Sequence, residues 1–393
     1  MTEWKEYKLG EITIEGKGSY GIAAPAVDFD INKYTYLRIT DINDDGTINK
    51  NSLKSVDDIN ASNYLLKPND IVFARTGASV GRSYFYDGKD GALVYAGFLI
   101  KFSLNPDKVN PKILKYYTHS QSYYDWIVSV DNGATRGNIN AQTYASMPII
   151  LPERKRQDEI VSILSSLDDK IDLLHRENKT LEAMAETLFR QWFIEEAKED
   201  WEENPLGKCI KLVGGGTPKT SEERFWNGNV FWLSGGDIAN NHKSFVSSSE
   251  KSISEDGLNN SSAKLLPENA MVISARGTVG KYCLLSKPMA FSQSNYGILP
   301  IYNDCYFFTY LLVAYHIDEL QSAAYGSVFD TITTKTFEGV SVLIPKETSY
   351  IVEFEKMIEP YFSKMKQNNK QIQTLIQQRD SLLPKLMSGE VKI

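Results

Sequence analysis

Residues 164–192 read LSSLDDKIDLLHRENKTLEAMAETLFRQW, and apolar side chains recur in this segment at alternating steps of three and four residues. This alternation is the heptad pattern of coiled-coil helices. The repeating positions are Leu164, Leu167, Ile171, Leu174, Asn178, Leu181, Ala185, Leu188 and Trp192. The pattern predicts one long helix within residues 153–196.

A second segment with the same alternation lies at the C-terminal end of the chain, within residues 346–393. Two single helices in one chain are most simply paired with each other, and a narrow apolar stripe favours a two-helix coiled coil. The alternative is a pair of amphipathic helices that each pack on their own domain. The repeating positions are Ile351, Phe354, Ile358, Tyr361, Met365, Asn368, Ile372, Leu375, Arg379, Leu382 and Leu386.

The phases of the two heptad patterns predict the register of the pair. Asn178 falls at an a position and Asn368 at a d position, and antiparallel coiled coils stack a against d. We therefore expect an antiparallel pair with Asn178 facing Asn368, although each Asn could instead be partly exposed. The same register places Leu174 near Ile372, Leu188 near Ile358 and Trp192 near Phe354. Buried Asn pairs fix register at some expense in stability, so Asn178→Leu is expected to raise thermal stability.

The rest of the chain repeats itself at an offset of about 200 residues, which is too long for a solenoid and indicates a duplicated domain. Short β-type runs such as 71–73 and 272–273 alternate with Gly- and Asn-rich turns and a few helical stretches. Four blocks keep their order: 4–10 returns as 201–207, 36–42 as 232–238, 65–82 as 265–281, and 138–152 as 331–345.

These patterns predict an α+β fold with two duplicated α/β domains separated by two long helices that form an antiparallel coiled coil. The predicted boundaries are 1–152 for the first domain, 153–196 for the central helix, 197–345 for the second domain and 346–393 for the C-terminal helix.

The bulk composition restricts the class of protein. The formal net charge of −7 counts against a free-standing nucleic-acid binder, unless positive charge gathers on one face or partners supply the phosphate contacts. The three cysteines, Cys209, Cys283 and Cys305, are far apart, which fits a reducing compartment. The chain contains no apolar run of membrane-spanning length, and its start lacks the layout of a signal peptide. We therefore expect a cytoplasmic protein.

No catalytic apparatus is visible in the sequence. The segment 16–21 matches G-x-G-x-x-G, but Pro25 and a strand-like run follow where a helix would be needed. The segment 277–281 is too short for a P-loop. The four histidines are isolated from one another, and no nucleophile triad or metal cluster is apparent. The sequence thus predicts a chain that is not itself an enzyme.

Several stretches together resemble the specificity subunits of Type I restriction-modification systems. Leu151-Pro152, Gln157, Ile160, Leu167-Asp168 and Leu181-Glu182 look like the stretch that follows the first target-recognition domain in that family. The ending 379–391, RDSLLPKLMSGEV, is similar to the ending of many such subunits. The segment 215–218, GGTP, resembles the opening of one recognition-domain type, and the first domain lacks it.

This resemblance implies a DNA-recognition role and a set of partners. These are double-stranded DNA, two adenine-N6 methyltransferase subunits and one or two ATP-dependent restriction/translocase subunits, with no membrane. S-adenosylmethionine, ATP and Mg would belong to those partners, so we expect no cofactor in this chain. The recognised sequence would be bipartite and asymmetric. The alternatives are the specificity module of a methylation-only system and that of a single-chain methyltransferase-nuclease.

The candidate DNA contacts are polar loop residues, because Arg and Lys bind guanine edges while Asn and Gln bind adenine. Each could equally be a solvated surface side chain. Trp4, Trp201, Trp226 and Trp232 are better explained as core anchors. The candidates are Arg38, Arg75, Arg82, Arg136 and Asn138 in the first domain, and Lys219, Thr220, Arg224, Arg276, Lys281, Gln293 and Ser294 in the second.

Overall fold

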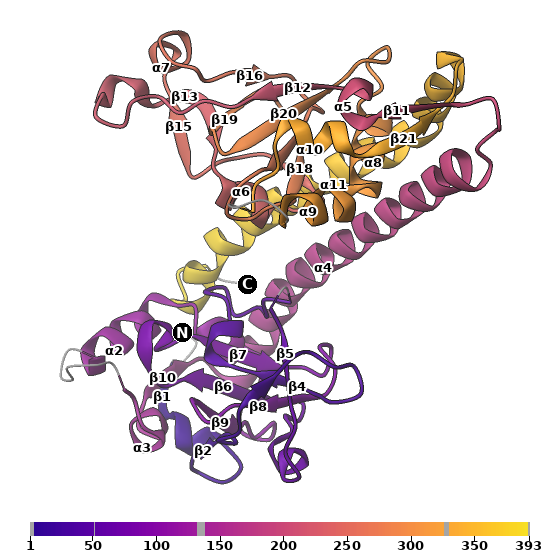
Figure 1. Ribbon diagram of the computed structural model, residues 1–393. Helices are drawn as coiled ribbons and strands as arrows, with labels where there is room; N and C mark the ends of the chain where they lie inside the picture. Colours follow the sequence, from indigo (N-terminus) through magenta and orange to yellow (C-terminus); the bar gives the residue numbers. More distant parts are fainter. Residues whose placement is uncertain (1–3, 51, 132–137, 326–329, 392–393) are drawn as a thin grey trace. The chain divides into compact units, whose positions relative to one another are not determined.

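The computed structural model describes residues 4–50, 52–131, 138–325 and 330–391 (Figure 1). The chain forms two compact units. The first unit comprises Met1–Asp169 and Leu375–Ile393, and the second comprises Lys170–Thr374. The two long helices, α4 (Arg154–Arg190) and α11 (Thr348–Met387), therefore each contribute one segment to each unit. No helix in the described part of the chain is both long and apolar enough to cross a membrane.

The first unit contains two four-stranded sheets, ordered β2-β9-β6-β7 and β3-β5-β4-β8, and a two-stranded sheet of β1 with β10. Its strands are β1 (Lys5–Lys8), β2 (Ser19–Tyr20), β3 (Ala26–Val27), β4 (Tyr34–Leu37), β5 (Lys54–Val56), β6 (Asp70–Ala74), β7 (Ser83–Tyr86), β8 (Leu93–Tyr95), β9 (Leu99–Ser103) and β10 (Pro148–Leu151). Its short helices are α1 (Ile113–Tyr117), α2 (Gln121–Asp131) and α3 (Ala141–Ala145).

The second unit repeats this plan with sheets β12-β20-β17-β18-β14, β15-β13-β19-β16 and β11-β21. Its strands are β11 (Glu202–Pro205), β12 (Ile210–Gly214), β13 (Trp226–Leu233), β14 (Phe245–Val246), β15 (Lys251–Ile253), β16 (Leu265–Leu266), β17 (Met271–Ser274), β18 (Tyr282–Leu285), β19 (Met289–Phe291), β20 (Asn295–Pro300) and β21 (Ser341–Ile344). Its helices are α5 (Leu206–Cys209), α6 (Gly235–Asn240), α7 (Glu255–Asn259), α8 (Tyr306–Tyr315), α9 (Ile317–Tyr325) and α10 (Thr334–Gly339).

A strand buried on both faces lies at the centre of each unit. In β6, Ile71 and Phe73 enter the core shared with the helices, whereas Val72 faces the core between the two sheets. In β17, Ile273 likewise enters the core shared with the helices, and Val272 faces the core between the two sheets. Because both faces are covered, these strands are continuous apolar runs rather than alternating ones.

The duplication extends to the turns. Asn69 and Asn269 both adopt a positive φ, of 75° and 66°, within two residues of the start of the central strand. Each donates its backbone N–H to the strand that follows the central one, Asn69 to Tyr86 O at 3.1 Å and Asn269 to Leu285 O at 2.8 Å. Asn is one of the few residues that tolerate this conformation. The predicted fold class, two duplicated domains joined by long antiparallel helices, is confirmed.

The apolar faces of the two long helices are broader than the heptad positions predict. Phe189 and Phe362 are almost fully buried, and so is Phe193 in the π-helical turn Gln191–Glu195 that continues α4, although none of the three belongs to the heptad set. Their neighbours Leu188 and Trp192 are only half-buried. The reason is that these helices pack on their own units as well as on each other, with α8, α9 and α10 covering the second-unit segments (Figure 1). Both alternatives left open by the sequence therefore hold in part.

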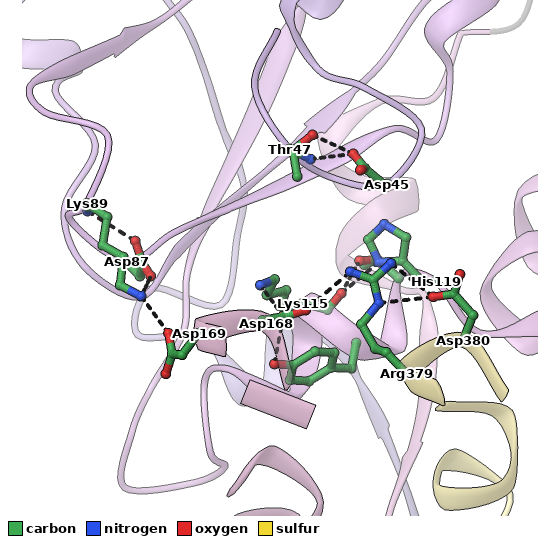
Figure 2. Close-up of polar contacts among 12 residues, drawn as sticks. Asp45, Thr47, Asp87, Lys89, Lys115, His119, Asp168, Asp169, Arg379 and Asp380 are labelled. Carbon is green, nitrogen blue, oxygen red and sulfur yellow. Dashed lines mark hydrogen bonds and ion pairs between the residues drawn. The ribbon is translucent and has the colours of Figure 1, made fainter. Parts of the chain in front are cut away.

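A largely buried carboxylate ties three elements of the first unit together. Asp168 on α4 accepts hydrogen bonds from Lys115 Nζ (2.6 Å) and Tyr116 of α1 (3.1 Å), and from Arg379 Nη1 of α11 (3.2 Å), as Figure 2 shows for Lys115 and Arg379. Its side chain is 16% exposed. Burial raises the pKa of this carboxyl, but Lys115 and Arg379 outweigh burial and hold the pKa below its usual value. Arg379, a heptad position by sequence, thus meets an acid rather than an apolar partner.

We predict that Asp168→Asn lowers the stability of the first unit at neutral pH by about 2 kcal/mol, because two cations lose their charged acceptor. A depressed pKa stabilises the folded state above the unfolded-state pKa, which is about 4. The difference between wild type and variant should therefore shrink as the pH falls from about 4 toward the lowered pKa. Hydrogen exchange of the backbone amides of residues 111–118 and 379–388, at pH 7 and at acid pH, measures this difference in stability.

Asp172→Asn is the matched control, because Asp172 forms an exposed ion pair with Arg176 on the same helix (3.0 Å). Exposed pairs of this kind contribute little, so no change in exchange is expected. Two outcomes would contradict a stabilising role of the ionised Asp168 carboxylate. One is an equal effect of the two substitutions, and the other is an effect of Asp168→Asn that does not change with pH.

Candidate nucleic-acid interface

In the first unit, four loop segments meet where strand β6 ends. The backbone N–H of Arg75 donates to Phe98 O (3.1 Å), and Ile139 N–H donates to Arg75 O (2.9 Å). Tyr20 OH accepts from the backbone N–H of Ala141 (3.1 Å). We call this set, residues 18–22, 75–82, 96–98 and 138–141, the first loop end.

The second unit forms the same junction where β17 ends. Ala275 N–H donates to Ser294 O (3.0 Å), and Ile332 N–H donates to Ala275 O (3.1 Å). Thr217 Oγ1 accepts from Gln293 N–H at 3.5 Å. The matching hydrogen bonds make Ala275 the counterpart of Arg75. We call residues 215–220, 275–281, 292–295 and 331–333 the second loop end.

Glycines allow these loops to project and to touch. Gly77 and Gly277 adopt φ values of 73° and 76°, and a Cβ on either would meet nothing within 4 Å, so both loops reach into open space. At Gly215, by contrast, a Cβ would lie 2.1 Å from Ser292 O. The GGTP segment therefore lies directly against the turn after β19 because Gly215 has no side chain.

Two of the predicted arginines of the first unit are held by carboxylates. Arg38 forms a two-pronged pair with Asp41 (2.9 and 2.6 Å), whose side chain is completely buried. Arg82 Nε lies 2.6 Å from Asp44 Oδ1, and its Nη1 donates to the Ile42 carbonyl. The 41–44 segment thus engages both guanidinium groups and ties them to the fold.

Arg75 and Asn138, in contrast, lie together with no carboxylate from the described residues in an ion pair with the guanidinium. Arg75 Nε and Nη2 lie 3.3 and 3.2 Å from Asn138 Oδ1. The guanidinium carbon lies 4.8 Å from the centre of the Tyr20 ring. Arg136, the remaining candidate of this unit, lies outside the described residues.

In the second unit the candidates fall into two groups. Lys219, Thr220, Arg276 and Gln293 are exposed at the second loop end, where Lys281 and Ser294 are half-buried. Arg224 stands apart from them. It lies 3.5 Å from Asp256 of α7 and 3.5 Å from Glu222, and it covers the Phe225 ring.

The aromatic residues at the loop ends have different roles from those of the tryptophans. Trp201 and Trp232 are buried, and Trp232 Nε1 donates to Gly216 O (2.9 Å), in agreement with an anchoring role. Tyr20 and Phe98 are 41% and 61% exposed at the first loop end, and sequence analysis did not single them out. Strand periodicity gives no signal for them, because Tyr20 ends the two-residue strand β2 and Phe98 lies in the turn between β8 and β9.

The chemistry of the loop ends suits recognition by hydrogen bonds. The described residues contain no group of three or more His, Cys, Asp or Glu side chains placed to hold a metal ion. Beside Lys281, burial and the neighbouring cations lower the pKa of His242 to about 4, so this ring stays neutral at physiological pH. Guanidinium, amide and hydroxyl groups on projecting loops provide the donors and acceptors that read base edges.

The asparagines of the long helices form a hydrogen-bonded network inside the second unit. Asn368 Nδ2 donates to Asn178 Oδ1 (2.8 Å) and to Glu177 (3.0 Å), and Asn178 Nδ2 donates to Asn369 Oδ1 (2.8 Å). Asn369 in turn donates to Ser244 Oγ (2.9 Å), next to strand β14. Hydrogen bonds between asparagine side chains therefore join the α4 and α11 segments of this unit, and Asn369 links them to the residue before strand β14.

Comparison with known proteins agrees with this architecture. The family described as "Type I restriction modification DNA specificity domain" matches residues 1–183 and 198–377. The chain therefore belongs to this family, and the resemblance seen in its sequence is confirmed. The two matched ranges correspond to the two repeated halves of the chain.

The chain is also similar to specificity subunits of Type I restriction enzymes. The chain is 24% identical to the Type I restriction enzyme HindI specificity subunit of Haemophilus influenzae, over the full length of both. It is 24% identical to the MjaIX specificity subunit of Methanocaldococcus jannaschii, over 73% of this chain and 70% of that protein. The crystal structure of the Type I restriction-modification system S subunit from M. genitalium has the same fold, with a TM-score of 0.56, 16% identity and coverage of 98% and 96% of the two chains.

The asparagine network changes the expected effect of Asn178→Leu. Sequence alone predicts a gain in stability, but the single substitution leaves Asn369 Oδ1 and one Asn368 donor without their partner, and Asn368 is fully buried. We predict that Asn178→Leu lowers the free energy of unfolding by about 1–3 kcal/mol. The double variant Asn178→Leu/Asn368→Leu should recover part of that loss, because it also removes the fully buried Asn368 amide that the single substitution leaves short of an acceptor, while Asn369 Oδ1 stays without its Asn178 donor.

Urea denaturation of the two single variants and the double variant measures this as a double-mutant cycle. Thr180→Leu, an exposed position on the same helix, is the control and should change little. Additive effects of the two asparagine substitutions would show that the hydrogen bond has no part in stability.

Proposed function

We propose that this chain recognises a bipartite, asymmetric double-stranded DNA sequence, with one half-site read by the loop end of each unit. The observation that carries the proposal is that equivalent positions of the two loop ends bear different side chains. Arg75 corresponds to Ala275. Arg82 corresponds to Lys281, because the backbone carbonyl of each accepts a hydrogen bond from the N–H of the last residue of the central strand. Two readers with one backbone plan and different side chains would read two different half-sites.

The net charge is consistent with a reader that works inside a complex. A net charge of −7 disfavours strong non-specific DNA binding by the chain alone, because such binding depends on contacts between cations and phosphates. We propose that two methyltransferase subunits, with one or two restriction subunits added for cleavage, supply the remaining contacts and all catalysis. S-adenosylmethionine, ATP and Mg would be bound by those partners, and this chain would serve as their non-catalytic scaffold.

We predict that the purified chain has neither methylation nor ATPase activity, and that adding the cognate methyltransferase subunit produces sequence-specific adenine methylation. The reason is that the chain supplies only recognition groups. Transfer of a labelled methyl group to DNA, with and without the methyltransferase subunit, measures it. Methylation by the chain alone would refute the non-catalytic role.

We further predict that exchanging residues 1–152 for the first domain of another family member changes one half of the methylated sequence only. The exchanged segment must contain both β1 and β10, because these strands pair from Lys5 with Leu151 to Lys8 with Pro148. Methylome sequencing before and after the exchange provides the readout, and the half-site read by the second unit is the internal control. A continuous palindromic target, or a change in both halves, would contradict the proposal.

A further inference from the structure

The backbone that carries Arg75 is fixed from several sides. Buried Tyr144 donates its OH to the Ala74 carbonyl (3.0 Å), and buried Tyr123 donates to the Gly81 carbonyl (2.6 Å), so both ends of the 75–81 loop are held by the core. The N–H and C=O of Arg75 itself are hydrogen-bonded to Phe98 and Ile139. The position from which this side chain leaves the first loop end is therefore set before any ligand arrives.

The side chain is also held in one orientation. The Tyr20 ring lies against the guanidinium plane, and Tyr20 is itself tied to the start of α3 by the hydrogen bond from Ala141 N–H. Asn138 Oδ1 accepts from Nε and Nη2 on one edge of the guanidinium. An arginine fork has five N–H donors, and no described residue accepts from its other edge, formed by Nη1 and the second proton of Nη2.

The charge of Arg75 is not neutralised by its partners. Within the described residues, Arg75 has no ion pair, whereas Arg38 and Arg82 are matched by Asp41 and Asp44. Phe98 beside it is 61% exposed and Arg75 itself is half-buried, so both side chains reach the surface at the first loop end. A cation held by an aromatic face and a neutral amide keeps its attraction for an acceptor and loses little side-chain entropy on binding it.

We infer that Arg75 reads a guanine in the half-site of the first unit, with its free edge donating to O6 and N7 of that base in the major groove. This inference rests on the proposed function and names one determinant of it. Guanine is the base whose major-groove edge offers two adjacent acceptors, which matches two parallel N–H donors.

The second unit lacks this determinant. Ala275 occupies the position of Arg75 and is 4% exposed, so no guanidinium leaves the second loop end at that point. The next residue, Arg276, is exposed on the projecting loop, and the described residues provide no hydrogen bond or ion pair for its side chain. An exposed arginine that no described side chain orients suits a phosphate contact, which makes Arg276 the matched control for Arg75.

The test uses the complex of the full chain with its methyltransferase subunits and the target defined by methylome sequencing. Arg75→Ala should weaken binding to the native target by roughly 10- to 100-fold and relax the preference at one guanine of one half-site. Arg75→Lys keeps the charge without the planar fork, so it should retain part of the affinity and lose the discrimination. Arg276→Ala should weaken binding to all DNA sequences alike. It should also reduce the slope of log affinity against log salt concentration by the amount that corresponds to about one phosphate contact.

A substitution in the DNA makes the test independent of protein folding. Replacing guanines one at a time with 7-deazaguanine removes the N7 acceptor, and at one position of the first half-site this should weaken wild-type binding but weaken Arg75→Ala no further. No sensitive guanine in that half-site, or an equal penalty for wild type and variant, would overturn the assignment to Arg75. A complex that binds no split DNA sequence would instead overturn the proposed function, so the two failures are distinguishable.

Discussion

The antiparallel packing of α4 against α11 is the constraint on which both cores depend. In the first unit, Leu164 of α4 and Leu386 of α11 close the core beneath β6. In the second unit, Phe189 and Phe354 do the same beneath β17. Neither sheet sandwich is covered by its own short helices alone, so each unit is completed by segments that are distant in sequence. This requirement explains why the buried faces of the helices are wider than a heptad stripe.

Polar groups give this packing its specificity. Apolar side chains tolerate sliding, whereas a buried amide or carboxylate is stable only opposite its partner. The asparagine network fixes the pairing of the helix segments in the second unit and extends it to Ser244. In the first unit Asp168 performs the same task by holding Lys115 and Arg379. Both devices lie inside their own unit, and both involve residues at or beside heptad positions.

The loop ends follow a different rule from that of the cores. The backbone hydrogen bonds around Arg75 and Ala275 are the same, and the glycines that let the loops project recur in both units. The side chains are not repeated: a fixed arginine stands at one loop end and a buried alanine at the other. A duplicated scaffold with independent surface residues is the physical form that a reader of two unlike sequences requires, because the core determines the loop path and leaves the exposed side chains free to differ.

The sequence by itself determined the duplication, the two long helices, their antiparallel sense and the phase that sets Asn178 against Asn368. These features rest on periodicity and local turn chemistry, which are written in neighbouring residues. Only the tertiary structure decided that Phe189, Phe193 and Phe362 are buried, since that depends on which elements cover the helices. The partners of the predicted arginines could not be predicted from the sequence either. Asp41 and Asp44 hold Arg38 and Arg82, whereas Tyr20 and Asn138, far from Arg75 in the chain, leave one edge of its guanidinium free. Contacts between distant residues follow from the packing of the whole unit, and no local pattern encodes them.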